Sequence, residues 1–225
     1  MSGPASVTGA SLRWTAEPPA PQAVALVLHG GRKHDTGPTG PWQLAVARLR
    51  PFAWAIARSA GGQMAVVSLQ YAKRGWNAEQ ARQQGREPDP VVDTRWALEV
   101  IRQRYPGVPI TLVGHSMGGR VALRLADAEA VAAVVTVGAW VEKADEQHWG
   151  RVGGMPMLLI HSPQDRVTDP AGSAYAAIAF SQRGADARYQ AINGDGHGMV
   201  RHPGQWHSAV AEYVVAQLID AGAGS

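Results

Sequence analysis

Residues 109–123 read PITLVGHSMGGRVAL, and this stretch is more informative about the fold than any other part of the chain. Its apolar start, 109–113, predicts a buried β-strand, and the pattern over 117–127 predicts an amphipathic helix that follows after a short turn. Val121 and Leu125 share the face of this helix that we expect to lie on a sheet. The opposite face carries Arg120, Arg124 and Asp127.

The turn between this strand and this helix, Gly114 to Gly118, has the pattern G-x-S-x-G. The pattern alone is a weak signal, but an apolar strand before it and a helix after it form the context in which such a turn presents a serine as a nucleophile. Glycines let the strand and the helix approach closely, and the helix N-terminus favours negative charge beside Ser116. Ser116 is therefore the candidate nucleophile, and the alternative is a glycine-rich turn with a capping serine.

Short apolar runs separated by helical patterns continue outward in both directions, which is typical of a parallel sheet with crossover helices. We expect an α/β fold with a mostly parallel sheet of about six to eight strands and helices on both faces. A single domain is expected over 1–225, with 1–20 and 221–225 loosely ordered. Pro51 should kink or split the helical segment 41–59. We expect the strands at 23–28, 64–69, 109–113, 131–137, 156–160 and 187–192.

The composition excludes several functional classes. The 225 residues include 21 Lys and Arg against 18 Asp and Glu, a net charge of +3, without the run of like charge that marks a nucleic-acid arm. The absence of cysteine excludes a disulfide framework, a thiolate metal site and a cysteine nucleophile. Residues 1–20 lack a basic leader with an apolar run, and no stretch approaches the roughly 18 apolar residues of a membrane span. We therefore expect a cytoplasmic protein that acts on a small molecule without a metal or cofactor, and that binds neither nucleic acid nor membrane.

A serine hydroxyl is a poor nucleophile unless a base takes its proton, so an acid and a histidine should follow Ser116 in the chain. Asp165 lies in the segment HSPQDRV, directly after the expected strand 156–160. His197 lies in the glycine-rich loop after the expected strand 187–192, where the base is expected. The alternatives are Asp145 and Asp195 for the acid and His202 for the base.

The segment His29-Gly30-Gly31-Arg32 follows the expected strand 23–28 and should lie at the same edge of the sheet. Two backbone N–H groups must point at the oxyanion of an acyl-transfer reaction, one from the residue after the nucleophile and one from such an early loop. Met117 and Gly31 are the candidates for these two positions.

The segments LVLHGG, LVGHSMGGRVAL, HSPQDRV and DGHGM occur in this order and resemble the α/β-hydrolase superfamily, in particular its small single-domain bacterial serine esterases without a large cap domain. The resemblance spans about residues 22–219. It implies a triad of Ser116, Asp165 and His197, an oxyanion hole at Gly31 and Met117, and hydrolysis of a carboxylic ester through an acyl-enzyme. Thioesterases, lactonases and acyltransferases use the same triad, and a non-catalytic ligand-binding protein on this scaffold is a further alternative.

Four side chains near the predicted site are candidates for contact with the substrate. Arg32 follows the oxyanion loop, and His115 precedes the nucleophile. Trp76 lies in the loop 72–88, and Trp140 lies beside the strand expected at 131–137. The alternative is that these side chains are solvated or pack the loops onto the body of the protein.

The insertion 139–155 is short and polar at the position where larger members of the superfamily carry a helical cap. An apolar lid that opens on lipid is not expected from such a sequence. The segment therefore predicts an open site for small soluble substrates.

Overall fold

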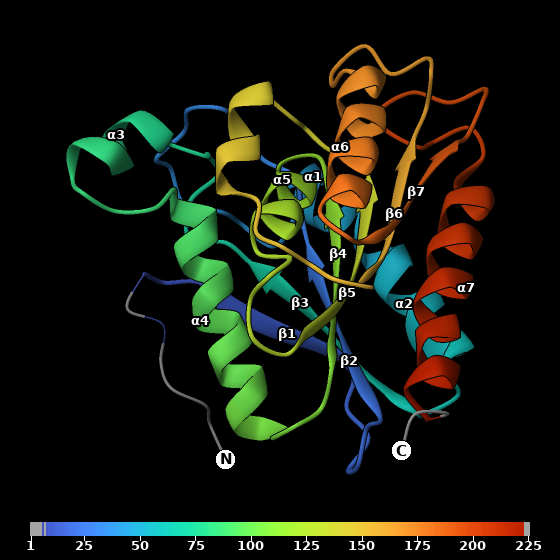
Figure 1. Cartoon of the computed structure of the whole chain (residues 1–225). Helices are drawn as coiled ribbons and strands as arrows, with labels where there is room; N and C mark the ends of the chain where they lie inside the picture. Colours follow the sequence, from blue (N-terminus) through green and yellow to red (C-terminus); the bar gives the residue numbers. More distant parts are fainter. Residues whose placement is uncertain (1–5, 7, 223–225) are drawn as a thin grey trace.

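The structure is a computed structural model that describes residues 6 and 8–222, with side chains through residue 217 at the C-terminal end. It is built on a seven-stranded sheet in the order β1-β3-β2-β4-β5-β6-β7 (Figure 1). All neighbouring strands are parallel except β1, which runs antiparallel to β3. The predicted α/β class and mostly parallel sheet are thereby confirmed. The strands are β1 (Ser11–Ala16), β2 (Ala23–Leu28), β3 (Met64–Gln70), β4 (Ile110–His115), β5 (Val131–Val137), β6 (Pro156–His161) and β7 (Asp186–Ala191).

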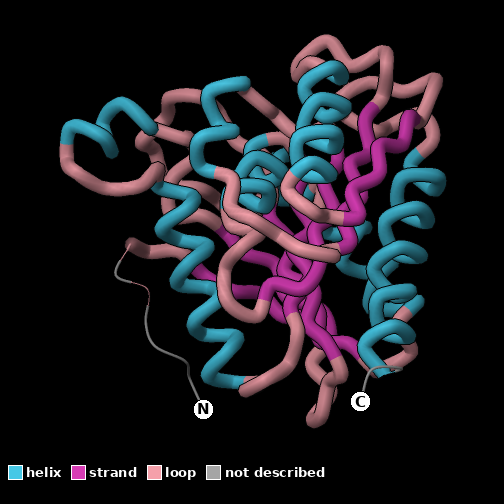
Figure 2. The backbone as a smooth tube through the Cα atoms, viewed as in Figure 1, coloured by secondary structure: helices cyan, strands magenta, loops and turns pink. Residues whose placement is uncertain are grey.

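Helices cover both faces of the sheet, as expected from its continuously apolar strands. Figure 2 shows the strands enclosed between helices, and Figure 1 shows α4 and α7 on opposite sides of the sheet. The helices are α1 (Leu44–Ala47), α2 (Arg50–Ser59), α3 (Ala78–Gln83), α4 (Asp89–Arg104), α5 (Met117–Arg124), α6 (Pro170–Gln182) and α7 (Pro203–Gly222), and a 3-10 helix, η1, spans Lys143–His148.

Two apolar layers hold the sheet, because successive side chains of a strand point to opposite faces. In β2, Leu26 belongs to the layer under α4, α5 and α6, whereas its neighbour Val27 belongs to the layer under α2 and α7. Both side chains are buried, and each such burial contributes roughly 1.5–3 kcal/mol to folding. The central strands are thus fixed from both sides, which gives the loops at their ends a rigid base.

The N-terminal segment differs from the prediction. We expected 1–20 to be loosely ordered, but Ser11–Ala16 forms the edge strand β1, paired with β3. Leu12 and Trp14 are half-buried and pack on the core, and this alternation of apolar and polar residues is the sequence signal that the Pro- and Ala-rich surroundings obscured. At the other end, α7 continues through Gly222, and the expectation for 223–225 lies outside the described residues.

Two helical predictions have different outcomes. The segment 41–59 is split as Pro51 predicts, since α1 ends at Ala47 and α2 begins at Arg50 with the proline in its first turn. The prediction that Arg120 lies on the exposed face of the helix after the G-x-S-x-G turn is wrong, because Arg120 is buried. Its guanidinium pairs with Asp145 at 2.6 Å, so a charge that the periodicity placed in solvent lies inside the fold.

The parallel strands bring the predicted site together at one edge of the sheet. The carboxyl ends of β2, β4, β6 and β7 lead into the loops that carry Gly31, Ser116, Asp165 and His197, respectively. This edge is where ligands and catalytic groups collect in open α/β sheets. Within the part of the chain that the structure describes, no helix has the length and apolar character to cross a membrane.

Candidate active site

Ser116 lies at the turn between β4 and α5 in a strained backbone conformation, with φ 55° and ψ −115°. A positive φ is uncommon for a residue other than glycine and is found where the surrounding structure enforces it. The two flanking glycines show why the turn is tight. A Cβ on Gly114 would lie 2.3 Å from the carbonyl oxygen of Gly118, and one on Gly118 would lie 2.2 Å from that of Leu28. The elbow predicted from the sequence therefore has the close strand–helix approach that its glycines imply.

Hydrogen bonds from neighbouring loops fix the backbone of Ser116. Its N–H donates to the carbonyl oxygen of Val137 at 3.1 Å, and its own carbonyl oxygen accepts from the N–H of Trp140 at 3.1 Å. The residue is 7% exposed, and its hydroxyl has no hydrogen-bond partner among the described residues. Ser116 is thus held at the end of β5 with its hydroxyl unused by the fold.

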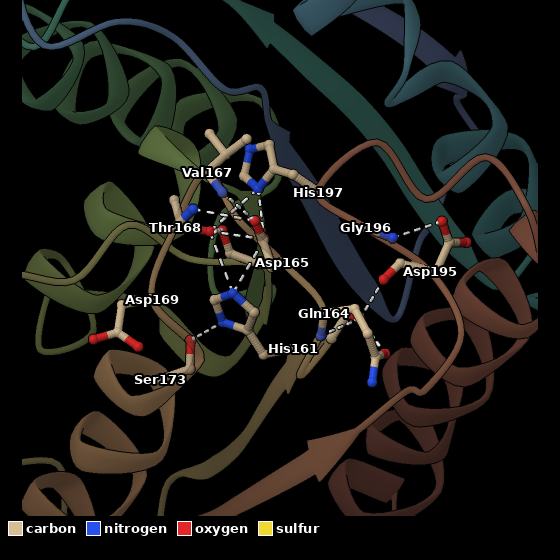
Figure 3. Close-up of polar contacts among 12 residues, drawn as sticks. His161, Gln164, Asp165, Val167, Thr168, Asp169, Ser173, Asp195, Gly196 and His197 are labelled. Carbon is tan, nitrogen blue, oxygen red and sulfur yellow. Dashed lines mark hydrogen bonds and ion pairs between the residues drawn. The ribbon is translucent and has the colours of Figure 1, made fainter.

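His197 and Asp165 are in contact (Figure 3). The Nδ1 atom of His197 lies 2.7 Å from Oδ2 of Asp165, which is the geometry of an N–H donated to a carboxylate. Both groups lie against Gly138, which directly follows Val137, the residue of β5 that accepts from the N–H of Ser116. A Cβ on Gly138 would lie 3.5 Å from His197 Nδ1 and 3.4 Å from Asp165 Oδ2. The structure therefore brings all three predicted residues to one place.

Asp165 is kept ionised by the donors that surround it. Burial opposes its charge, but hydrogen bonds from His161 and His197 and from the N–H groups of Val167 and Thr168 outweigh that effect and hold its pKa below the usual range. The two backbone N–H groups donate to Oδ1 at 2.8 and 3.1 Å. One oxygen of the carboxylate is thus occupied by the loop, and the other, Oδ2, faces the imidazole.

The two alternative acids have other partners. Asp195 is buried and accepts from the N–H groups of Val200, Arg201 and His202 and from Nε1 of Trp206. It organises the loop that carries His197, and burial of its carboxylate is offset by these donors, which hold its pKa below the usual range. Asp145, as described above, pairs with Arg120 on the far side of α5. Neither carboxylate contacts the His197 ring, which favours the choice of Asp165.

His161 and Thr168 were not assigned a role from the sequence, and both contact Asp165. The Nε2 atom of His161 lies 3.2 Å from Asp165 Oδ2, and its Nδ1 lies 2.7 Å from the hydroxyl of Ser173 in α6. The hydroxyl of Thr168 lies 2.9 Å from the same Oδ2 and 3.2 Å from His197 Nδ1. The position of His161 at the end of a strand, four residues before the acid, was the available signal.

His115 lies beneath the loop of His197. Its ring centroid is 4.7 Å from that of His197, and its Nε2 is 3.3 Å from the His197 carbonyl oxygen. Burial, together with the neighbouring His197 and Arg48, lowers the pKa of His115 to about 3. We predicted contact between His115 and substrate; the structure places this ring below the surface, where it supports the loop as a neutral group.

The two residues predicted for the oxyanion hole are neighbours in space, with the Met117 side chain packed against Gly31. A Cβ on Gly31 would lie 2.4 Å from Cε of Met117 and 2.5 Å from the carbonyl oxygen of Arg74, so a larger residue would fit only if the backbone shifted. The N–H groups of Gly31 and Met117 donate no hydrogen bond among the described residues. Next to them is a cleft of about 350 Å³ with walls formed by Gly30, Gly31, Leu44 and Ala45, and by the side chain of Arg32.

The tryptophans predicted to contact substrate hold a buried arginine. The guanidinium of Arg120 lies 4.5 Å from the Trp76 ring centroid and 4.2 Å from that of Trp140. Trp76 is buried and Trp140 is half-buried. This cation–π arrangement ties α5 to the loop 72–88 and to the insertion, whereas a contact of either ring with substrate stays a prediction.

Among the side chains that the structure describes, those of residues 6 and 8–217, no three or more His, Asp or Glu are grouped so that they could hold a metal ion. His34, His148 and His202 are exposed, and His207 is half-buried. The histidine of the C-terminal loop that contacts Asp165 is His197 and not the alternative base His202.

Comparisons with known proteins agree with the observed fold. The profile of a family described as "alpha/beta hydrolase fold" matches residues 71–149. No curated protein matches the chain in sequence. Among solved structures, Est1E from Butyrivibrio proteoclasticus has a TM-score of 0.66 at 12% identity over 93% of this chain and 94% of its own. A serine hydrolase without lid from Xanthomonas campestris, XC6422, has a TM-score of 0.62 at 16% identity over 91% of this chain and 87% of its own. The esterase domain of a Rhodothermus marinus protein has a TM-score of 0.64 at 19% identity over 92% of this chain and 90% of its own.

Proposed function

We propose that this chain, which has the α/β-hydrolase fold, is a serine hydrolase that cleaves a carboxylic ester through an acyl-enzyme. One observation carries the proposal. Ser116 is held in a strained turn at the start of α5, and an imidazole already paired with a carboxylate lies at the end of the neighbouring strand. Strained backbone and a histidine–carboxylate pair at one sheet edge are the arrangement that activates a serine hydroxyl.

In the first half of the reaction, Nε2 of His197 accepts the proton of the Ser116 hydroxyl while Oγ attacks the ester carbonyl carbon. The carbonyl oxygen gains the negative charge, and the N–H groups of Met117 and Gly31 donate to it. Collapse of this intermediate breaks the bond to the alcohol, which leaves with the proton from His197. An acyl group then remains bound to Ser116 Oγ.

Water completes the reaction by the reverse sequence of proton transfers. It gives a proton to His197 as its oxygen attacks the acyl carbon, the same N–H groups stabilise the oxyanion, and Ser116 recovers its proton when the acid leaves. The hydroxyl of Ser116 makes no hydrogen bond with the residues that the structure describes, and catalytic contacts of this kind commonly form only when substrate binds.

Asp165 has the role of keeping His197 in the reactive tautomer. With Nδ1–H donated to the carboxylate, Nε2 is left unprotonated and can accept the serine proton. The negative charge also stabilises the imidazolium that forms during each half-reaction. Because the donors around Asp165 keep it ionised, this charge is present throughout the physiological pH range.

The substrate that fits best is a small soluble ester. The insertion between β5 and β6 folds as the short 3-10 helix η1, whose exposed residues include Lys143 and Gln147. No apolar surface for binding to lipid is supplied by η1, and Arg120 anchors the insertion to α5 through Asp145 and Glu142. We expect this segment to stay in place, which leaves the cleft beside Gly31 open to small molecules.

Three variants test the proposal with 4-nitrophenyl acetate as substrate. Ser116→Ala and His197→Ala should each lower kcat by on the order of 10⁴ or more, and the double variant should be scarcely worse than either, because the groups act as a unit. Circular dichroism and thermal melting verify that the variants are folded. Full esterase activity in folded Ser116→Ala would overturn the proposal.

A further inference from the structure

The cleft beside Gly31 carries more positive charge than its carboxylates neutralise. Both Arg32 and Arg74 line it. Arg32 lies 3.3 Å and Arg74 3.6 Å from the same oxygen of Asp35, so a single carboxylate serves two guanidinium groups. The side chain of Arg32 is 72% exposed and is able to reorient toward a ligand.

Arg48 adds a third positive charge on the side of His197. It follows α1, the helix whose residues Leu44 and Ala45 form the apolar wall of the cleft. One terminal nitrogen of Arg48 lies 3.8 Å from the position that a Cβ on Gly198 would take, which places the charge beside the loop of the candidate base. Its effect reaches the buried His115, whose pKa it helps to lower.

Arg48 differs from the other buried and half-buried arginines in its lack of an internal partner. Among the residues that the structure describes, it is the one partly buried arginine whose guanidinium has neither a hydrogen bond nor an ion pair. Elsewhere such groups are compensated: Arg120 pairs with Asp145, Arg183 with Glu146, and Arg86 with Asp89. A guanidinium that is accessible to solvent, has no internal partner and lies beside the loop of the candidate base is available to bind an anionic ligand.

The loops around the site strengthen the same field. Arg166 and Arg201 are exposed and lie in the loops that carry Asp165 and His197. Two carboxylates of these loops, Asp165 and Asp195, are buried and used by internal hydrogen bonds. A third, Asp169, is exposed and caps α6 by accepting from the N–H of Ala171. A cleft edged by positive charge raises the local concentration of anions and speeds their association.

We propose that the substrate is an ester that carries a carboxylate, which Arg48 and Arg32 bind while the apolar wall of α1 contacts the rest of the molecule. This inference rests on the proposed serine hydrolase function and names its substrate class. Guanidinium groups bind carboxylates through paired, charge-assisted hydrogen bonds, which are about twice as strong as neutral ones. The preference for an anionic ester over its neutral counterpart should therefore be about tenfold or more in kcat/KM at low ionic strength.

Two matched pairs of esters test the proposal, one for each side of the scissile bond. The acyl-side pair is mono-4-nitrophenyl adipate and 4-nitrophenyl hexanoate, which differ by a terminal carboxylate. The alcohol-side pair is 4-acetoxybenzoate and its methyl ester. We expect the anionic member of at least one pair to be preferred about tenfold or more, and the preference to weaken as salt is added, since screening acts on exposed charges.

Variants assign the preference to Arg48. The ratio of kcat/KM for the anionic and the neutral ester should fall about tenfold in Arg48→Gln and less in Arg48→Lys, which keeps the charge but loses the fork of donors. Arg58→Gln is the matched control. Arg58 is exposed near the end of α2, which leads into the start of β3, at the edge of the sheet opposite the candidate site. Its ratio should stay as in the unmodified protein.

The outcomes separate this inference from the proposed function. Hydrolysis of the neutral esters that requires Ser116 but shows no preference for either anionic ester would overturn the substrate class alone. A preference that persists in Arg48→Gln, or that falls equally in Arg58→Gln, would overturn the role of Arg48. Absence of Ser116-dependent hydrolysis of all four esters would overturn both proposals.

Discussion

Replacing Asp165 by asparagine is the substitution whose effect can be worked out most fully from the structure. The loop N–H groups of Val167 and Thr168 donate to Oδ1 and require an acceptor there, so the amide oxygen of the asparagine should take that place. The amide NH₂ then occupies the position of Oδ2 and faces Nδ1 of His197. Because NH₂ is a donor, Nδ1 must become the acceptor and the proton moves to Nε2.

With its proton on Nε2, His197 cannot accept the proton of Ser116. A wrong tautomer of this kind lowers kcat by about 10⁴, which corresponds to about 5 kcal/mol of barrier. KM should change little, since no substrate contact is removed. The measurement is kcat and KM for 4-nitrophenyl acetate, with thermal melting to verify the fold.

Asp195→Asn and Asp145→Asn are the matched controls. Asp195 accepts from the loop N–H groups of residues 200–202, so Asp195→Asn should lower stability more than it changes the tautomer of His197. Asp145→Asn should weaken the pairing of the buried Arg120. Each should retain kcat within about a hundredfold. The reasoning is refuted if Asp165→Asn keeps kcat within about tenfold of the unmodified protein, or if either control is the more severely affected variant.

Three further predictions follow from the same structure. Gly31→Ala should lower kcat by about 10²–10³, because its Cβ would lie 2.5 Å from the carbonyl oxygen of Arg74 and force the backbone that carries the Gly31 N–H to shift. Gly196→Ala, with nothing within 4 Å of the new Cβ, should leave kcat nearly unchanged, and equal effects of the two substitutions would contradict this prediction. Burial lowers the pKa of His29 to about 4 and of His115 to about 3, so below about pH 6.5 the unfolded chain binds more protons than the folded protein. The free energy of unfolding should therefore decrease as the pH falls from about 6.5 toward about 4. A urea midpoint that does not change between about pH 7.5 and 5 would disprove this prediction. Activity on 4-nitrophenyl esters should peak at about two to six acyl carbons, since the added methylenes of a longer acyl chain would stay exposed to solvent. A maximum at about twelve carbons, or activation at an oil interface, would show that a lid exists.

The sequence was sufficient for the parts of the site that depend on local pattern. Ser116 could be identified because strand, glycine turn and helix are contiguous in the chain. Asp165 and His197 could be identified because each follows an apolar strand, and parallel strands deliver their carboxyl ends to the same edge. The contact of 2.7 Å between these two side chains is therefore a consequence of topology that the order of the segments already implies.

What the sequence did not reveal depends on contacts between remote segments. The burial of Arg120 requires Trp76, Trp140 and Asp145, which come from two different loops, and helical periodicity alone placed the arginine in solvent. His161 is buried because α6 brings Ser173 against it. Likewise, only the packing of α1 places the charge of Arg48 beside the loop of His197.

The central claim, that Ser116 is an activated nucleophile, is tested most directly by covalent labelling. We expect a fluorophosphonate to add one equivalent to the folded protein, with the adduct located by mass spectrometry on the peptide that contains Ser116. Labelling should be abolished in Ser116→Ala and strongly slowed in His197→Ala, because the hydroxyl is nucleophilic only when the imidazole takes its proton. An adduct on another residue, or a folded protein that remains unlabelled, would contradict the account.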